Sequence, residues 1–232
     1  MNDQSPLANH AVAPNSADEI RETIIRSFRG SAHHDRPYSH WILDEVIPLA
    51  SARMIPELPF PAPVIDDTEG KRDTHNSTRV FFSEENQAKY PVCKAIAEAL
   101  QHPETVAAIK DVTGADLDGS SLRIEYAQDR DGFWLEPHTD IGPKRITFLH
   151  YLIDLPGAET LGTDIYEDDE AHAHAGTSPA AFNQGFVFVP AKNTWHGFEK
   201  RTIPGIRKSI IINYVGPEWR NRQELAFPND PV

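Results

Sequence analysis

Apolar and polar positions follow two different spacings along this chain of 232 residues. Up to about residue 115 the apolar residues recur at helical intervals, as in ADEIRETIIRSF, where Ile20, Ile24, Ile25 and Phe28 form one stripe. From about residue 120 short apolar stretches are separated by Gly, Pro, Asp or Asn, which is typical of antiparallel strands. The pattern therefore predicts a helical half, 18–115, packed against a C-terminal β-core.

The helical half contains several predicted elements and one irregular stretch. Ser16 or Asp18 is the expected N-cap of the first helix, which would leave residues 1–17 as a mobile tail. The segment HWILDEVIPLASARMI predicts a second helix that Pro48 either bends or starts. The proline-dense stretch PELPFPAPVIDDTEGKRD cannot hold regular structure for long, and STRVFFS after it alternates like a strand. Two further helices are expected over 84–101 and 103–113, the second ending near Gly114.

The C-terminal half is predicted to be one antiparallel sandwich or barrel. Its β-rich stretches are SLRIEYAQ, RITFLHYLID, TDIYED, GFVFVP and KSIIINYV. The long polar segment EDDEAHAHAGTSPAAFNQ, 167–184, is expected to be a loop, either a lid or a surface excursion. Because no internal repeat is visible, residues 18–232 are predicted to form a single α+β domain with its β-core over about 120–215.

Composition and charge narrow the function classes. Hydrophobic residues make up 39% of the chain and charged residues 25%, as expected for a soluble globular protein. The formal net charge of −13 disfavours nonspecific binding to nucleic acid or to an anionic membrane, although a local basic pocket for a small anion stays open. The single cysteine, Cys93, excludes a disulfide within the chain and a thiolate zinc site, and its helical setting predicts a core position.

Targeting signals are also missing from the sequence. The N-terminal stretch MNDQSPLANHAVAPNSADE has no basic region followed by an apolar run, and no apolar run approaches the ~20 residues that span a bilayer. We therefore expect a cytoplasmic protein. Because no basic or aromatic groove is visible, a small polar metabolite is the expected partner, and the oligomeric state stays open.

A candidate metal site lies in the β-core. His138 and Asp140 stand two residues apart in WLEPHTDIGPKR, so in a strand their side chains point to the same side. His196 follows the apolar stretch GFVFVP and a short turn. Two neutral imidazoles and one carboxylate on one face of an octahedral Fe(II) leave three positions open, enough for a bidentate cosubstrate and dioxygen. Arg207 and Ser209, downstream of this pattern, are suited to grip a carboxylate.

With H-x-D, a distal histidine and R-x-S in this order, the chain resembles the Fe(II)- and 2-oxoglutarate-dependent dioxygenases, specifically their prolyl-hydroxylase-like branch. The resemblance covers roughly residues 120–215 and implies a double-stranded β-helix, a cupin-like jelly roll with packed N-terminal helices. It implies Fe(II) bound by the catalytic residues His138, Asp140 and His196, with 2-oxoglutarate and O2 as cosubstrates. Succinate and CO2 would be co-products, and ascorbate can support such activity.

The resemblance also assigns a cosubstrate site. Arg207 matches the residue that pairs with the far carboxylate of 2-oxoglutarate, and Ser209 matches its hydrogen-bonding companion. In RITFLHYL, alternation places Thr147 and Tyr151 on one face, and Tyr151 matches a tyrosine that bonds the same carboxylate. Tyr126 matches a tyrosine near the metal-binding end of the cosubstrate. Aromatic residues in strands are also common packing residues, so both tyrosines keep that second interpretation.

Hydroxylation of an unactivated C–H bond in a small polar metabolite is the expected function. Related halogenases have Gly or Ala in place of Asp140, so the carboxylate favours hydroxylation over halogen transfer. Two alternatives stay open. The same cofactor chemistry can give desaturation, cyclisation or epimerisation, and a cupin-like module can bind a metal or ligand without turnover. Arg207 and Ser209 argue against the module, because a passive metal site does not need them.

Several other polar residues have two interpretations. Arg79, Arg123 and Trp195 are candidates for substrate binding, although ion pairs for the arginines and core packing for the tryptophan are ordinary roles. His172 and His174 form an H-x-H that could hold a second metal ion, but a solvated loop is favoured. Taken alone, the His138 and Asp140 pair would be an ordinary turn; its combination with the distal histidine and arginine favours the metal site.

Overall fold

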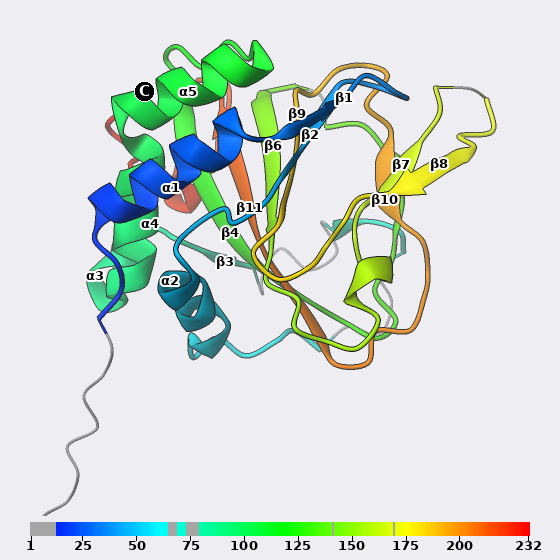
Figure 1. Ribbon diagram of the computed structural model, residues 1–232, viewed down its shortest axis with the longest axis horizontal. Coiled ribbons are helices and arrows are strands. Elements are labelled where there is room, and N and C mark those ends of the chain that lie inside the picture. Colours follow the sequence, from blue (N-terminus) through cyan, green and yellow to red (C-terminus); the bar gives the residue numbers. More distant parts are fainter. Residues whose placement is uncertain (1–12, 65–68, 73–78, 141, 169) are drawn as a thin grey trace, which may run out of the picture.

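The computed structural model describes residues 13–64, 69–72, 79–140, 142–168 and 170–232. Most of the expected N-terminal tail, 1–17, lies outside these residues. Helices gather on one side of a large sheet, and a smaller sheet lies on its other side (Figure 1). All neighbouring strands in both sheets pair antiparallel.

The larger sheet has seven strands in the spatial order β1-β2-β9-β6-β11-β4-β3. The long strands β4, β11 and β6 lie side by side, and β9 connects them to the short strands β2 and β1. The strands are β1 (Ala32–His34), β2 (His40–Leu43), β3 (Val80–Phe81), β4 (Ser121–Arg130), β6 (Lys144–Tyr151), β9 (Gly185–Phe188) and β11 (Ile206–Val215).

The smaller sheet has four strands in the order β5-β10-β7-β8. They are β5 (Leu135–His138), β10 (His196–Phe198), β7 (Asp164–Tyr166) and β8 (His174–Thr177). Strand β8 lies inside the segment 167–184, so the expectation that this whole segment is a loop was wrong. Its sequence HAGT has no apolar alternation, and its pairing with β7 supplies the order that the local sequence does not indicate.

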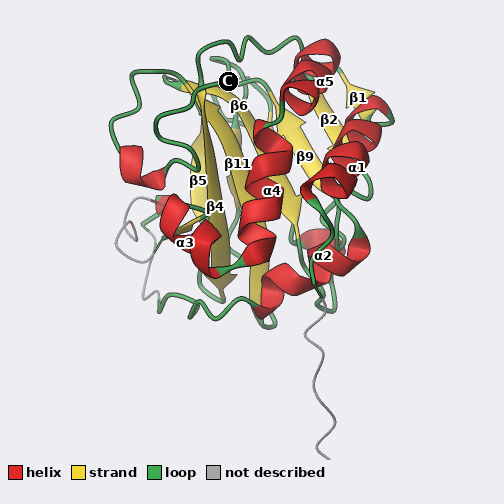
Figure 2. Cartoon of the chain, turned by 90° about the vertical axis from the view of Figure 1, so that its left-hand side faces the viewer, coloured by secondary structure: helices red, strands yellow, loops and turns green. Residues whose placement is uncertain are grey.

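The helices cover one face of the larger sheet (Figure 2). Ser16 caps the first helix, and the Ser16 and Glu19 side chains form a reciprocal capping box. The last helix ends, as predicted, at Gly114, which adopts a left-handed conformation with φ 72°. The helices are α1 (Ala17–Arg29), α2 (Leu49–Met54), α3 (Glu84–Lys89), α4 (Pro91–Gln101) and α5 (Pro103–Thr113), with 3-10 turns at Ile55–Glu57, Ala158–Thr160 and Arg222–Glu224.

Two helix predictions need correction. In HWILDEVIPLASARMI only Leu49–Met54 is helical, while His40–Leu43 forms β2 in the large sheet. A short apolar run fits either structure, and pairing with β9 decides it here. The helix expected over 84–101 is two helices, because Pro91 cannot donate a backbone hydrogen bond and starts α4 instead.

Alternation along the central strands separates a core from a cavity. In β11, Ile210, Ile212 and Tyr214 belong to the core beneath the helices, while Arg207 and Asn213 line a cavity on the other face. The helix-side core is tightly packed; in it the Phe28 and Phe148 rings meet edge to face at 5.4 Å, a contact that contributes about 1 kcal/mol beyond area burial.

The second face of the larger sheet packs against the smaller sheet. Leu149 and Tyr151 of β6 share an apolar cluster with Ile165 of β7 and Phe198 of β10. The mixed arrangement of helices and two antiparallel sheets is a jelly-roll-type core. Among the described residues, none of the helices combines the length and apolar character needed to cross a bilayer.

Candidate metal centre

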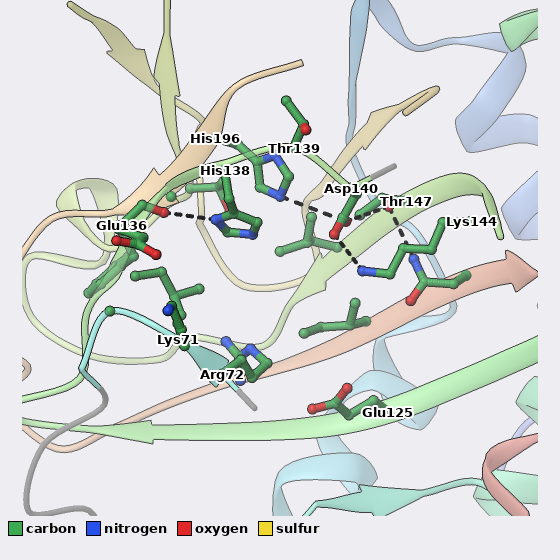
Figure 3. Close-up of a pocket in the computed structure, with 18 of the residues that line it drawn as sticks. Lys71, Arg72, Glu125, Glu136, His138, Thr139, Asp140, Lys144, Thr147 and His196 are labelled. Carbon is green, nitrogen blue, oxygen red and sulfur yellow. Dashed lines mark hydrogen bonds and ion pairs between the residues drawn. The ribbon is translucent and has the colours of Figure 1, made fainter. Parts of the chain in front are cut away.

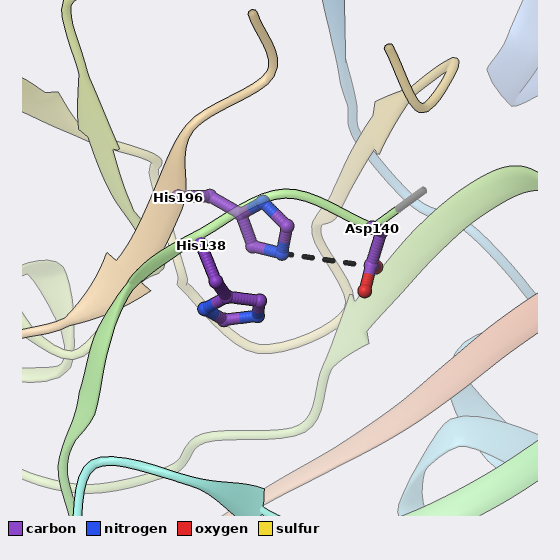
Figure 4. Close-up of side chains that lie close together, drawn as sticks. All are labelled: His138, Asp140 and His196. Carbon is purple, nitrogen blue, oxygen red and sulfur yellow. Dashed lines mark ion pairs between the residues drawn. The ribbon is translucent and has the colours of Figure 1, made fainter. Parts of the chain in front are cut away.

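Three side chains meet where the edge of the smaller sheet faces the cavity. His138 ends β5 and stands directly opposite His196 of β10 in the strand register, and their ring centroids are 4.4 Å apart. Asp140 follows just beyond β5, with its Oδ2 3.7 Å from His196 Nε2 (Figure 4). The three potential ligand atoms all lie within 4.8 Å of one another. The structure therefore brings the predicted triad together.

Backbone carbonyls fix the orientation of both imidazoles. His138 Nδ1 lies 2.8 Å from the Glu136 carbonyl oxygen, and His196 Nδ1 lies 2.9 Å from the Thr194 carbonyl oxygen. A carbonyl only accepts, so each Nδ1 carries the proton and each Nε2 keeps its lone pair. Two neutral histidines presenting Nε2 next to one carboxylate are the donor set of a facial Fe(II) site.

Electrostatics keep Asp140 and His196 in metal-binding protonation states. Burial lowers the pKa of His196 to about 4, so its imidazole is neutral at neutral pH. Burial alone would raise the pKa of Asp140, but Lys144 and His196 outweigh it and hold that pKa well below its usual range. Lys144 Nζ donates to Asp140 Oδ1 at 2.5 Å, and Thr147 Oγ1 donates to Asp140 Oδ2 at 2.9 Å.

Gly197 allows the two metal-binding strands to approach each other. A Cβ atom at this position would lie 2.9 Å from the Leu135 carbonyl oxygen and 3.1 Å from that of Glu136. Neither backbone atom can move aside without shifting β5. The glycine after the distal histidine is therefore a packing requirement of the paired strands.

A cavity of about 480 Å³ opens beside the triad, between the two sheets (Figure 3). Its apolar walls include Phe133, Leu149 and Phe198. Its polar walls include Thr147 and Asn213, and Asn213 Nδ2 donates to Thr147 Oγ1 at 3.1 Å. A cavity of this size between two sheets, with apolar walls and convergent polar groups, is typical of a small-molecule site.

Arg207 is buried in the wall of this cavity. Its Nη1 donates to Asp129 Oδ2 at 2.6 Å and its Nε donates to the Leu161 carbonyl oxygen at 2.6 Å. No bond of Nη2 to another described residue is formed, so this nitrogen remains for a ligand. Ser209, two residues later on β11, is fully buried, and its Oγ has no hydrogen-bond partner among the described residues. Ser209 is not among the residues that line the cavity, although it shares a face of β11 with Arg207. An unsatisfied buried hydroxyl on the same strand face as a buried guanidinium fits a carboxylate ligand.

The other predicted cosubstrate residues lie in different places. Tyr151 pairs with Ser209 in the strand register, but its hydroxyl bonds Thr163 at 2.7 Å and Ser178 at 2.8 Å. Thr147 lines the cavity and bonds the metal-ligand carboxylate. Tyr126 lies on the helix-covered face of β4, away from the triad cavity, because alternation turns its neighbour Glu125 toward the cavity instead.

The candidate substrate residues divide in the same way. Arg79 and Arg123 line the cavity. Trp195 does not: its indole stacks on His172 at 3.8 Å and donates to Asp168 at 2.9 Å. His174 lies 3.3 Å from Asp164, which also forms an ion pair with Arg201. Among the described residues, no second group of metal ligands forms around His172 and His174.

The sequence did not indicate several cavity residues. Lys71 and Arg72 come from the irregular proline-rich region, where no periodicity predicts an orientation. Alternation along the strands could have indicated Glu125 and Asn213. Glu125 lies two residues from Arg123 on β4, and Asn213 lies six residues from Arg207 on β11, so each shares a strand face with a candidate site residue. Lys144, which the sequence left without a role, bonds the metal-ligand carboxylate.

Comparison with known proteins supports the fold. A Pseudomonas putida prolyl-4-hydroxylase superposes with a TM-score of 0.53 at 11% identity, covering 89% of this chain and 98% of the other. A Trichoplax adhaerens prolyl hydroxylase, solved with a hypoxia inducible factor peptide, gives 0.55 at 9% identity, covering 86% and 90%. The non-heme alpha-ketoglutarate-dependent epimerase SnoN of nogalamycin biosynthesis gives 0.50 at 15% identity, covering 90% and 88%.

These structures share their architecture with this chain over nearly its whole length. A scan of protein-family models and a search of curated proteins found no match. At such low identities the similarity establishes the fold alone. The chain has the fold of these prolyl hydroxylases and of the epimerase.

Proposed function

We propose that this protein is an Fe(II)- and 2-oxoglutarate-dependent dioxygenase. The observation that carries the proposal is the pair of Nε2 lone pairs on His138 and His196 facing Asp140 in a cavity that also contains Arg207. The metal site fits Fe(II) by its donor set. The buried Ser209 hydroxyl, two residues along β11 from the arginine, has no partner among the described residues and fits the far carboxylate of 2-oxoglutarate.

The protein's own groups would bind and orient the reactants. When bound, Fe(II) with 2-oxoglutarate activates O2 to oxidise a C–H bond, releasing succinate and CO2. Lys144 and Thr147 hold the two oxygens of Asp140, and backbone carbonyls hold the imidazoles. Arg207 and Ser209 would orient the cosubstrate, and the aromatic and aliphatic walls would limit water.

We propose that the core is a double-stranded β-helix. In support, the seven-stranded and four-stranded antiparallel sheets pack face to face. The proposed metal ligands are His138 at the end of β5, Asp140 just after β5, and His196 of β10. The two paired strands at the edge of the smaller sheet would then form the metal-binding mouth of the jelly roll.

Hydroxylation of a small polar metabolite, by a cytoplasmic enzyme, is the outcome that we propose. A cavity of about 480 Å³ between the two sheets supports a small substrate. The carboxylate at position 140 supports oxygen insertion. The structural similarity to an epimerase favours one second outcome, epimerisation by the same cofactors. Mass spectrometry distinguishes them, because hydroxylation adds one oxygen atom and epimerisation leaves the mass unchanged.

The experiment is 2-oxoglutarate turnover under air with Fe(II) and ascorbate, followed by succinate formation. The wild-type protein is expected to form succinate slowly without substrate, and Asp140→Ala is expected to lose this activity and its high Fe(II) affinity. Asp154→Ala, on the loop after β6 and outside the cavity, is the matched control. Tight binding of 2-oxoglutarate without any succinate formation would contradict the proposed dioxygenase activity and favour a non-catalytic binding module.

A further inference from the structure

A group of arginines lines the cavity away from Arg207. Arg123 extends from β4, Arg79 lies just before β3, and Arg72 comes from the segment that crosses beside β5. Figure 3 shows Arg72 below the triad, between His138 and Glu125 in this view. We call Arg72, Arg79 and Arg123 the arginine wall. Arg123 is fully buried and Arg72 and Arg79 are partly buried, so each has little access to water and is costly there unless it serves a ligand or an ion pair.

Each arginine of the wall is held in one orientation. All three Arg123 nitrogens are bonded: Nε to Glu224 at 2.7 Å, Nη1 to Asn213 at 3.2 Å and Nη2 to Glu125 at 3.0 Å. Arg79 Nε donates to Glu125 Oε1 at 2.9 Å and its Nη2 donates to Oε2. Burial alone would raise the pKa of Glu125, but Arg79 and Arg123 lower it to about 2. Glu125 is therefore ionised at neutral pH and pairs with both Arg79 and Arg123.

Arg72 is positioned by backbone contacts of its own segment. The Gly70 carbonyl oxygen accepts a hydrogen bond of 3.0 Å from Glu136 N on β5. A Cβ atom on Gly70 would lie 2.8 Å from the Trp134 ring, so the glycine lets the segment dock. Arg72 then bonds both oxygens of Asp129, at 3.1 and 3.4 Å, and lies over the Phe133 ring at 4.7 Å.

Positive charge is concentrated in this cavity although the chain carries −13 overall. Among the described lining residues, the carboxylates are Glu125, Glu136 and Asp140, and the cations are Lys71, Arg72, Arg79, Arg123, Lys144 and Arg207. Asp129 and Glu224 pair with Arg72 and Arg123 from behind the cavity surface.

The cavity also has more room than the cosubstrate needs. 2-Oxoglutarate has ten non-hydrogen atoms, which at roughly the ~30 Å³ of a liquid water each would take at most ~300 Å³. The cavity measures about 480 Å³. Trp219 also lines the cavity, and its ring lies 5.1 Å from the Arg123 guanidinium. Its buried Nε1 has no hydrogen-bond partner among the described residues, so the indole offers a donor beside the arginine wall.

We propose that the arginine wall and Trp219 bind the substrate, and that the substrate is a small molecule carrying an oxyanion, a carboxylate or a phosphate. The inference rests on the proposed dioxygenase function and names its substrate class. Guanidinium groups and an indole N–H are matched donors for oxyanions. Binding at the wall places the rest of a small molecule in the cavity space that continues to the triad.

Hydrogen bonds connect the arginine wall to the metal ligand. Arg123 Nη1 donates to Asn213 Oδ1, Asn213 Nδ2 donates to Thr147 Oγ1, and Thr147 Oγ1 donates to Asp140 Oδ2. A ligand that moves Arg123 would therefore alter the contacts of the Asp140 carboxylate. This connection predicts that an anionic substrate raises 2-oxoglutarate turnover in addition to binding.

The test compares matched probes on the wild-type protein loaded with Fe(II) and 2-oxoglutarate. Small carboxylates and phosphate monoesters are compared with the amides, alcohols and amines of the same carbon skeletons. Oxyanions are expected to raise succinate formation at least ~10-fold, whereas neutral and cationic analogues do not. The carboxylate and phosphate arms identify which oxyanion the site takes. Equal stimulation by amines or amides would overturn the proposal.

Binding and variants complete the test. In the protein loaded with Mn(II), calorimetric titration should detect binding of the same oxyanions. Arg79→Gln should lower their binding affinity by ~10- to 100-fold, as the loss of a charged hydrogen bond does. Trp219→Phe keeps the ring and removes the N–H, and should weaken them less. Arg53→Gln, an exposed arginine on α2, is the control. Absence of oxyanion binding would refute the proposal that the substrate carries an oxyanion. Oxyanion binding without any 2-oxoglutarate turnover would refute only the proposed dioxygenase function.

Discussion

Lys144 and Asp140 form an ion pair of 2.5 Å at the side of the candidate metal site. Thr147 bonds the other oxygen of the same carboxylate at 2.9 Å. Each oxygen of Asp140 is therefore held by one protein donor, and the carboxylate cannot rotate freely. A ligand held in this way needs little reorganisation to bind a cation.

We expect Lys144→Met to weaken Fe(II) binding by ~10- to 100-fold, the usual effect of removing a partner of a metal ligand. The methionine keeps the length of the side chain and removes its charge, so the orientation of Asp140 is lost without a cavity. Anaerobic Fe(II) titration measures the change. Arg145→Gln is the control, because that arginine is half exposed and contacts Glu218 at 3.6 Å outside the site. Unchanged affinity in Lys144→Met would contradict a positioning role.

Ser209→Ala should separate cosubstrate binding from folding. The Ser209 hydroxyl is buried without a hydrogen-bond partner among the described residues, so its removal should change the free energy of unfolding by less than ~0.5 kcal/mol. If the hydroxyl serves the carboxylate of 2-oxoglutarate, the KM for 2-oxoglutarate should rise ~10-fold or more, as the loss of one hydrogen bond to a charged group does.

Ser120→Ala is the opposite control for this measurement. The buried Ser120 hydroxyl donates to the Leu117 carbonyl oxygen at 2.6 Å, away from the cavity. Its removal should lower the free energy of unfolding by about 1 kcal/mol and leave the KM unchanged. A destabilised Ser209→Ala with an unchanged KM would show that the hydroxyl has a structural role only.

The grouping of His138, Asp140 and His196 could be predicted from the sequence, because its signal combines local spacing with chain order. His138 and Asp140 carry the spacing, and the strand before His196 locates the third ligand. What the sequence could not supply was the partner of each side chain. Arg207 was expected to await a carboxylate, yet it already pairs with Asp129, its cross-strand neighbour. Such cross-strand pairs depend on register, which one sequence does not specify.

The less predictable parts depend on tertiary contacts. His40–Leu43 is short and apolar, so only its pairing with β9 makes it a strand. Arg72 lies in an irregular segment that Gly70 docks on β5, and no periodicity indicates this. Tyr126 was assigned from the resemblance, whereas alternation along β4 would have turned Glu125 to the cavity and the tyrosine toward the helices. Alternation was the stronger guide at that position.

His150 makes the stability of the fold depend on pH. It lies on the helix-side face of β6, fully buried, with Nε2 2.9 Å from Asn183 Oδ1, and burial lowers its pKa from 6.5 to about 4. As the pH falls below 6.5, the unfolded chain takes up a proton at this residue and the folded chain does not. The free energy of unfolding should therefore decrease from pH 6.5 to pH 4, by up to about 3 kcal/mol from this group.

His150→Gln keeps an N–H donor for Asn183 and removes the titration, so its stability should fall less over the same pH range. Chemical denaturation at a series of pH values measures the slope. Tyr214→Phe is the control, because it removes a buried hydrogen bond of 2.6 Å to the Leu100 carbonyl oxygen without removing a group that titrates there. It should lower stability equally at every pH. An identical slope in His150→Gln and wild type would mean that His196 or the carboxylates, and not His150, set the acid sensitivity.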